Sequence, residues 1–220
     1  MSTPEHFSYS SPVAQRPWDA RLARRLVMPL KDSWVTPNHL TTIRLGVGLA
    51  AAVAFLPGSY GWSNLAALLL ILSNFLDHTD GELARISGKT SRIGHIYDLA
   101  SDAVVTITLF IAIGIGVGDK PDNLSPVSPV GLGVVAGCAI ALIFYLRMRI
   151  EDMVGKLANS QASIGGFETE DVLYLLPLAT LSNAVTPLLF AAALCAPLFA
   201  LWVVIDYVQV LRRQRARTTR

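Results

Sequence analysis

Four aspartates, in two pairs with helical spacing, are the residues of this sequence most able to do chemistry. Asp77 and Asp80 are three residues apart and Asp98 and Asp102 are four apart, so on helices each pair shares a face, separated by about 60° and about 40°. Carboxylates this close repel one another by on the order of a few kcal/mol unless protons or cations neutralise them. Oxygen ligands in this number suit two Mg²⁺ or Mn²⁺ ions with open positions for phosphate oxygens.

Small residues and an arginine extend the same helix face. Gly81 and Ala84 lie on the side of Asp77 and allow a ligand or a neighbouring backbone to come close. Arg85, one turn after Gly81, can bind phosphate through a bidentate fork. Gly81 and Ala84 alone would favour a helix-packing seam, but the adjacent carboxylates favour a phosphate-binding site.

The elements that position these residues are apolar helices. Hydrophobic residues make up 52% of the 220 and charged residues only 15%, against roughly 25% charged in an average soluble domain. Several apolar runs approach the roughly 20 residues that a helix needs to span a bilayer. The pattern predicts an all-α, polytopic membrane protein with six transmembrane helices. The runs are residues 39–56, 63–76, 103–117, 130–146, 172–181 and 187–205.

The distribution of basic residues predicts an orientation. Of the 18 Lys and Arg, all but Lys120 fall on one side of a six-span arrangement, as the positive-inside rule expects of the cytoplasmic side. Both termini and the aspartates are therefore expected on the cytoplasmic side. The net charge of only +2 gives no reason to expect a nucleic-acid partner.

The segment before the first apolar run is expected to lie on the membrane. Trp18, Leu22 and Leu26 recur every four residues with arginines beside them, which is typical of a basic amphipathic helix in the membrane interface. A plain cytoplasmic tail is the alternative. The predicted organisation is a tail with an interfacial helix over residues 1–33, a six-span domain over 34–211 and a basic cytoplasmic tail over 212–220.

The spacing of these aspartates and their small and basic neighbours resembles a known family motif. The pattern Asp77-x2-Asp80-Gly81-x2-Ala84-Arg85-x8-Gly94-x3-Asp98-x3-Asp102 resembles the signature of the CDP-alcohol phosphotransferase family, also called CDP-alcohol phosphatidyltransferases. The six-span layout, the N-terminal interfacial helix and the opening of the first span at Pro37-Asn38 to Thr41 extend the resemblance over most of the chain. It implies a helical bundle, expected as a homodimer, that transfers a phosphoalcohol group from a CDP-linked donor to a hydroxyl and releases CMP.

The resemblance also implies roles for individual residues. Asp77, Asp80 and Asp98 would hold the metal ion at the donor's diphosphate. Asp77, Asp98 and Asp102 would hold a second ion, and Asp102 would be the general base for the acceptor hydroxyl. Residues expected around the nucleotide and donor are Asn38, Thr41, Gly81, Ala84, Arg85, Ser91 and Gly94.

The sequence indicates the substrates less directly than it indicates the type of reaction. CDP-diacylglycerol, a lipid donor, and a polar alcohol acceptor are expected by analogy to small bacterial members, which also points to the bacterial inner membrane. A soluble CDP-alcohol with a lipid acceptor is the alternative, and a cation or proton transporter is the rival of a different class, because intramembrane carboxylates also mark ion paths.

The sequence leaves open which acceptor the enzyme uses and what three of its arginines contact. Ala103 follows Asp102, where enzymes for glycerophosphate and inositol-phosphate acceptors have Lys or Arg. Leu99 follows Asp98, where serine enzymes have Ser, so the acceptor is not assigned. Arg147 and Arg149 would receive an acceptor phosphate or extend to lipid headgroups. Arg44, within the first span, would face the nucleotide cavity or pair with a buried carboxylate.

Overall fold

The computed structural model describes residues 18–118, 127–154 and 171–218, and these residues form helices and turns without any strand. The predicted all-α class is therefore confirmed for the described part of the chain. The helices are α1 (Trp18–Val27), the short 3-10 helix η2 (Met28–Leu30), α2 (Pro37–Phe55), α3 (Tyr60–Ser87), α4 (Arg92–Gly118), α5 (Pro129–Val154), α6 (Asp171–Leu181) and α7 (Val185–Thr218).

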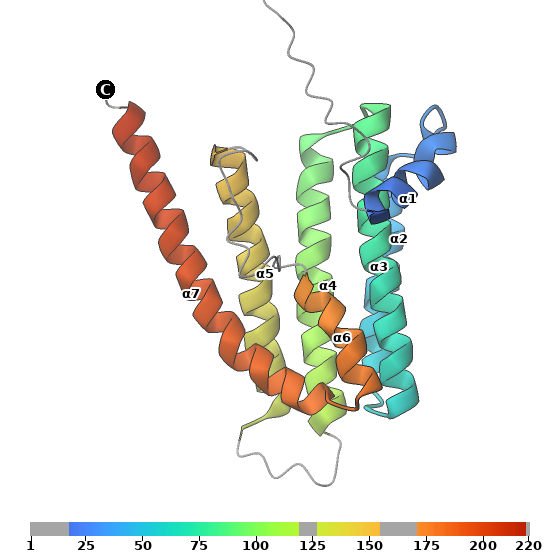
Figure 1. Ribbon diagram of the computed structural model, residues 1–220, viewed down its shortest axis with the longest axis vertical. Coiled ribbons are helices and arrows are strands. Elements are labelled where there is room, and N and C mark those ends of the chain that lie inside the picture. The colour runs from blue at the N-terminus through green and yellow to red at the C-terminus, as the bar shows by residue number, and fades with distance from the viewer. Residues whose placement is uncertain (1–17, 119–126, 155–170, 219–220) are drawn as a thin grey trace, which may run out of the picture.

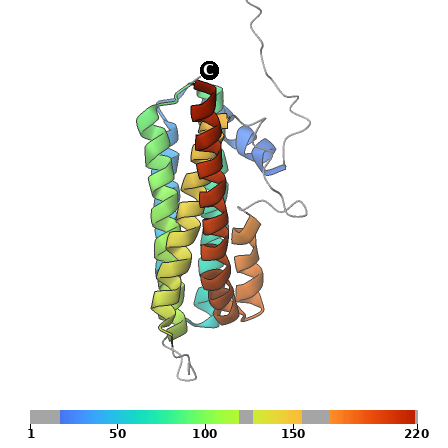
Figure 2. The ribbon, with the colours of Figure 1, turned by 90° about the vertical axis from the view of Figure 1, so that its left-hand side faces the viewer.

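Helices α3, α4 and α5 run along the long axis of the molecule, and the longer α7 is tilted relative to them (Figure 1). Helix α2 packs against α3 and α4, α5 packs against α4 and α7, and α6 packs against α3. The turned view shows α1 and α6 on one side of this bundle (Figure 2). Phe55 of α2, Leu109 and Ile113 of α4 and Leu189 of α7 belong to one buried apolar cluster. The connection from α3 to α4 and the C-terminal end of α7 lie at the same end of the bundle, which we call the motif end.

Local hydrogen bonds set the helix boundaries at the motif end. The backbone N–H of Thr36 donates to His39 Nδ1 at 3.1 Å, which satisfies one polar group at the start of α2. Helix α3 stops at Gly88, whose φ of 67° favours glycine. Ser91 Oγ accepts from the backbone N–H of Gly94 at 2.9 Å and so caps α4. Lys89 Nζ, in the connection from α3 to α4, donates to the carbonyl of Ser33 at 2.6 Å, so this connection lies beside the segment that leads into α2.

Close helix packing lies next to the motif. A Cβ atom at Gly48 of α2 would lie 2.6 Å from Val105 Cγ2 of α4, so the two helices can approach this closely only because residue 48 is glycine. Ser73 Oγ of α3 donates to the carbonyl of Arg44 at 3.1 Å. Three helices are thus held together one turn or so below the aspartates.

Membrane insertion is supported by three of the helices. Among the described residues, Arg92–Gly118, Pro129–Val154 and Val185–Arg215 are long and apolar enough to cross a membrane, which supports an integral membrane protein. The count of six spans stays a prediction.

Two helices extend further than the apolar runs that predicted them. Helix α3 continues past Asp80 to Ser87, where Arg85 and Glu82 form an i,i+3 ion pair at 2.9 Å that supports the last turns. Helix α7 continues through the basic segment to Thr218.

Helix α1 carries apolar side chains on both its buried and its exposed side. Ala23 and Val27 are buried on the helix that packs against α3, whereas Leu22 and Leu26 are exposed. Apolar side chains that face away from the protein would suit a membrane surface. The position of α1 in the interface stays a prediction.

Candidate active site

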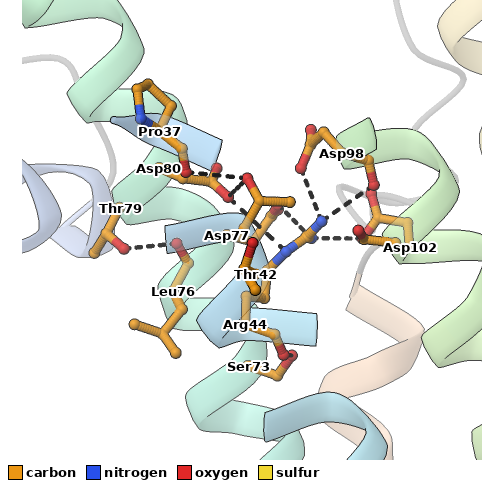
Figure 3. A network of polar contacts seen from close by, with 12 residues as sticks. Pro37, Thr42, Arg44, Ser73, Leu76, Asp77, Thr79, Asp80, Asp98 and Asp102 are labelled. Atoms are coloured by element: carbon orange, nitrogen blue, oxygen red, sulfur yellow. Dashed lines mark hydrogen bonds and ion pairs between the residues drawn. The ribbon is translucent and has the colours of Figure 1, made fainter. Parts of the chain in front are cut away.

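The predicted aspartates meet between two neighbouring helices at the motif end. Asp77 and Asp80 lie on α3, and Asp98 and Asp102 lie on α4 (Figure 3). One carboxylate oxygen from each of Asp77, Asp98 and Asp102 lies within 4.8 Å of the others. Spacing along two helices has thus produced a three-dimensional cluster, as the short α3–α4 connection predicts.

The four carboxylates differ in exposure. The side chains of Asp77, Asp98 and Asp102 are 41%, 37% and 41% exposed, whereas that of Asp80 is 7% exposed. Asp80 Oδ2 instead accepts a hydrogen bond from Thr41 Oγ1 of α2 at 2.8 Å. Three carboxylates therefore present an open side to a substrate, and Asp80 forms the closed side of the cluster.

Arg44 of α2 lies at the centre of the cluster with a side chain that is only 5% exposed. Its Nη1 donates to Asp77 Oδ1 at 2.5 Å and to Asp102 Oδ1 at 2.6 Å, and its Nη2 donates to Asp98 Oδ1 at 2.8 Å. Asp80 Oδ2 is further away, 3.9 Å from Arg44 Nε. Of the two alternatives left open by the sequence, the structure places Arg44 against carboxylates.

The donor atoms at this site fit a hard divalent cation. All converging ligands are carboxylate oxygens, the type that Mg²⁺ and Mn²⁺ prefer. A buried arginine among them shows that the cluster requires positive charge, since close carboxylates repel one another in a partly buried site. The residues present are therefore suited to hold Mg²⁺ or Mn²⁺.

Several residues predicted around the nucleotide lie at the contact of α2 with α4. A Cβ atom on Gly94 would lie 2.8 Å from Asn38 Oδ1 and 3.0 Å from Ser91 Oγ, so the glycine leaves room for the Asn38 side chain to lie against α4. Ser91 also caps α4, which gives it a structural reason to be serine. Thr41 reaches Asp80, so it joins this contact to the carboxylate cluster.

The other predicted donor residues lie on α3 beyond the cluster. A Cβ atom at Gly81 would have only Arg85 Nη2 within 4 Å, at 3.6 Å, and Ala84 is half-buried on the same helix. The Arg85 side chain is 57% exposed. The guanidinium therefore lies next to Gly81 on a largely exposed side chain, where a phosphate could bind.

The sequence reasoning missed Glu82, a buried carboxylate within the motif. Its Oε1 pairs with Arg85 Nη2 at 2.9 Å, and its Oε2 lies 3.8 Å from Arg24 Nη1 of α1. Glu82 thus connects the N-terminal helix to Arg85. The spacing of Glu82 and Arg85, three residues apart, was the available signal.

Arg147 and Arg149 lie apart from this cluster in contacts of their own. Arg147 Nη1 is 3.7 Å from Asp206 Oδ2 of α7, and its guanidinium carbon lies 5.0 Å from the centre of the Trp202 ring. Arg149 pairs with Asp152 at 3.9 Å along α5. The structure brings neither arginine to an aspartate of the motif.

Comparison with known families agrees with the motif. The sequence matches the CDP-alcohol phosphatidyltransferase family over residues 34–210. This match spans most of the chain, from the segment before α2 into α7, and includes α3 and α4, which carry the four aspartates.

Curated relatives are similar over part of their length. The chain is 38% identical to the CDP-diacylglycerol–glycerol-3-phosphate 3-phosphatidyltransferase of Cereibacter sphaeroides, over 44% of each chain. It is 32% identical to archaetidylinositol phosphate synthase of Pyrococcus horikoshii, over 46% of this chain and 52% of that protein. It is 35% identical to cholinephosphotransferase 1 of Danio rerio, over 41% and 26%. The matches thus span about a quarter to a half of these relatives.

A solved structure shares the fold. The crystal structure of Mycobacterium tuberculosis phosphatidylinositol phosphate synthase, with CDP-DAG bound, matches with a TM-score of 0.55 over 89% of this chain and 92% of that one, at 22% identity. The arrangement of helices described above is therefore one found by experiment in another protein.

Proposed function

Because the chain belongs to the CDP-alcohol phosphatidyltransferase family, we propose that it transfers a substituted phosphate group from a CDP-linked donor to the hydroxyl of a polar alcohol, with release of CMP. The proposed donor is CDP-diacylglycerol and the product a phospholipid. The observation that carries this function is the convergence of Asp77, Asp98 and Asp102, with the exposed Arg85 further along α3. An ion path would need the carboxylates but not an arginine and glycine arranged for phosphate.

The four aspartates would bind divalent cations, and one of them would also remove the proton of the acceptor hydroxyl. Asp77, Asp80 and Asp98 would hold one divalent cation, and Asp77, Asp98 and Asp102 a second. Two Mg²⁺ or Mn²⁺ ions, when bound, would supply charge neutralisation for the diphosphate and for the departing CMP. The partly exposed side chains of Asp77, Asp98 and Asp102 leave room for the donor on that side.

Asp102 is the proposed general base. Its side chain is accessible and carries no hydrogen bond from Thr41 of the kind that Asp80 has. The acceptor oxygen would form a bond to the donor's distal phosphorus as the bond from that phosphorus to the diphosphate bridging oxygen breaks. The hydroxyl proton passes to Asp102, and the bridging oxygen leaves with CMP.

The donor's nucleotide is proposed to lie over the α2–α4 contact and the outer turns of α3. Asn38 and Gly94 approach each other there, and Arg85 is exposed above Gly81. The residues assigned to this part of the site are Asn38, Thr41, Gly81, Ala84, Arg85, Ser91 and Gly94.

Arg85→Lys is expected to weaken donor binding about tenfold. Lysine keeps the charge but cannot pair with Glu82 and a phosphate through a planar fork, and loss of one hydrogen bond to a charged group, roughly 1.5 kcal/mol, corresponds to about that factor. The measurement is equilibrium binding of labelled CDP-diacylglycerol. Arg92→Lys, at an exposed position of the motif end, is the control and should bind normally. Unchanged affinity for Arg85→Lys would make Arg85 a structural residue.

Arg147 and Arg149 are proposed to contact an acceptor phosphate, if the acceptor carries one. Arg147 is already held by Asp206 and Trp202, so its guanidinium is positioned without a substrate. Release of CMP with phosphorylated and with unphosphorylated alcohols, compared directly, tests which kind of acceptor is used.

The experiment that tests the function is release of CMP by the purified protein. With Mg²⁺ or Mn²⁺ and labelled CDP-diacylglycerol, CMP should appear only with some alcohols of a panel that includes glycerol 3-phosphate, inositol phosphate and serine. A parallel arm offers CDP-choline and diacylglycerol, because the similarity to cholinephosphotransferase 1 favours a soluble CDP-alcohol with a lipid acceptor as the second candidate. Absence of CMP in both arms, with cation flux across reconstituted vesicles, would favour the transporter instead.

We propose that the protein lies in the bacterial inner membrane as a homodimer, with both termini and the active site on the cytoplasmic side. The basic residues support this orientation, since Lys120 alone of 18 falls on the other side. A reporter fused near residue 122 that reads as cytoplasmic would overturn the orientation. A monomeric mass in detergent and in nanodiscs would overturn the dimer.

A further inference from the structure

Arg44 is buried where a divalent cation would have to bind. The same three residues that offer converging ligand oxygens, Asp77, Asp98 and Asp102, each accept a hydrogen bond from its guanidinium (Figure 3). An ion that uses Asp77 Oδ1 and Asp102 Oδ1 together must lie between these two atoms. Arg44 Nη1 already lies there, in contact with both.

The guanidinium and such an ion exclude each other for two reasons. Nη1 occupies the space within hydrogen-bonding distance of both oxygens, so no room is left for a second centre. Like charges at this distance also repel strongly in a site whose arginine is only 5% exposed. Binding of a divalent cation to Asp77 and Asp102 therefore requires Arg44 to move.

The structure offers Arg44 a second position. Its Nε is buried without a hydrogen-bond partner, and the nearby carboxylate Asp80 has its Oδ2 3.9 Å away. Asp80 is on the closed side of the cluster and is fixed by Thr41. Withdrawal of the guanidinium toward Asp80 Oδ2, far enough for Nη1 to leave Asp77 Oδ1 and Asp102 Oδ1, would give Nε a partner and keep the buried charge paired, as a buried ion requires. The other carboxylate oxygen of Asp80 would then be the one that serves the cation proposed for Asp77, Asp80 and Asp98.

We propose that Arg44 is an internal cation that holds the carboxylate cluster together when divalent ions are absent and competes with them for Asp77, Asp98 and Asp102. It stabilises the metal-free protein and lowers the affinity for metal, because loading requires the guanidinium to leave first. The role of Arg44 rests on the proposed function only in taking these aspartates as metal ligands. It is a positioning residue and touches no substrate.

Removal of the charge tests this role without substrate. Arg44→Met keeps an unbranched side chain of similar reach, and we expect its dissociation constant for Mn²⁺, measured from the electron paramagnetic resonance signal of free Mn²⁺, to fall at least about fivefold, within the usual range of coupling between two ligands of one site. In chelator its melting temperature should fall below that of the wild type. The rise in melting temperature on addition of Mn²⁺ should be larger.

Two further variants keep the test decisive. Arg44→Gln, which lacks the charge but keeps hydrogen-bond donors, should also bind Mn²⁺ more tightly; it is measured alongside Arg44→Met and decides alone if Arg44→Met does not fold. Arg92→Met removes an exposed charge from the motif end and should leave Mn²⁺ affinity unchanged. Equal or weaker Mn²⁺ binding in both Arg44 variants would overturn the competition and make Arg44 a permanent part of the metal site. Failure of the transferase assay would leave these binding results standing.

Discussion

Asp77→Asn is expected to abolish tight divalent-cation binding and to lower CMP release by at least about 10²- to 10³-fold, the loss typical when one group that stabilises developing charge is removed. Asp77 carries one of the three converging oxygens and faces the open side of the cluster with a side chain 41% exposed. Asparagine has nearly the same size but brings no negative charge. Excess chelator should reduce wild-type activity to background, and added Mg²⁺ or Mn²⁺ should restore it.

The measurement pairs Mn²⁺ binding with initial rates of CMP release on the same preparations. Asp32→Asn, which alters an exposed aspartate outside the cluster, is the control and should match the wild type in both. Folding is checked by melting temperature in chelator, where the carboxamide oxygen introduced by Asp77→Asn can still accept a hydrogen bond from Arg44. Full activity of the wild-type protein in excess chelator would rule out the divalent cations, whatever the variant does.

The part of the site that follows from local spacing was predicted from the sequence. The separation of Asp77 from Asp80 and of Asp98 from Asp102 fixes the helix faces, and the short connection between them makes the two helices neighbours. The structure confirms that Asp77, Asp98 and Asp102 converge. The all-helical class, predicted from the apolar runs, is confirmed for the described residues, and the family, predicted from the motif, is confirmed by the match over residues 34–210.

The contacts of Arg44 could not be predicted, because they depend on residues 33, 54 and 58 positions away along the chain. Local periodicity places Arg44 on α2 but not the rotation of α2 relative to α3 and α4. That rotation is set by the close approach at Gly48 and Val105 and by the hydrogen bond from Ser73 to the carbonyl of Arg44. Both are products of tertiary packing.

Helix lengths were underpredicted for a different reason. An apolar run shows which part of a helix is buried in lipid or in the protein core. The helix can continue beyond that run where its polar side chains form hydrogen bonds or ion pairs. Glu82 and Arg85 pair with each other on α3, and Gln214 Nε2 of α7 donates to the carbonyl of Met153 on α5 at 2.6 Å. These contacts stabilise the last turns of α3, which ends at Ser87, and the part of α7 that lies beyond its apolar run.

Asp102→Asn is expected to separate proton removal from donor binding. Asp102 and Asp77 are equally exposed and accept hydrogen bonds from the same Arg44 nitrogen, so their surroundings alone do not distinguish them. The distinction lies in the chemistry proposed for Asp102, which accepts the proton of the acceptor hydroxyl. Asparagine keeps a ligand oxygen at this position but is not an effective base.

CDP-diacylglycerol binding should therefore survive in Asp102→Asn, while turnover falls by roughly 10² to 10⁴, the usual contribution of general acid-base catalysis. Asp77→Asn is the matched comparison, because it should lose metal-dependent donor binding as well as turnover. Binding of labelled donor and single-turnover release of CMP are measured on both variants, so that a slow chemical step is not confused with slow product release. Near-normal single-turnover rates for Asp102→Asn would place the base elsewhere, since a carboxamide in contact with Arg44 cannot take up the proton that the acceptor must lose.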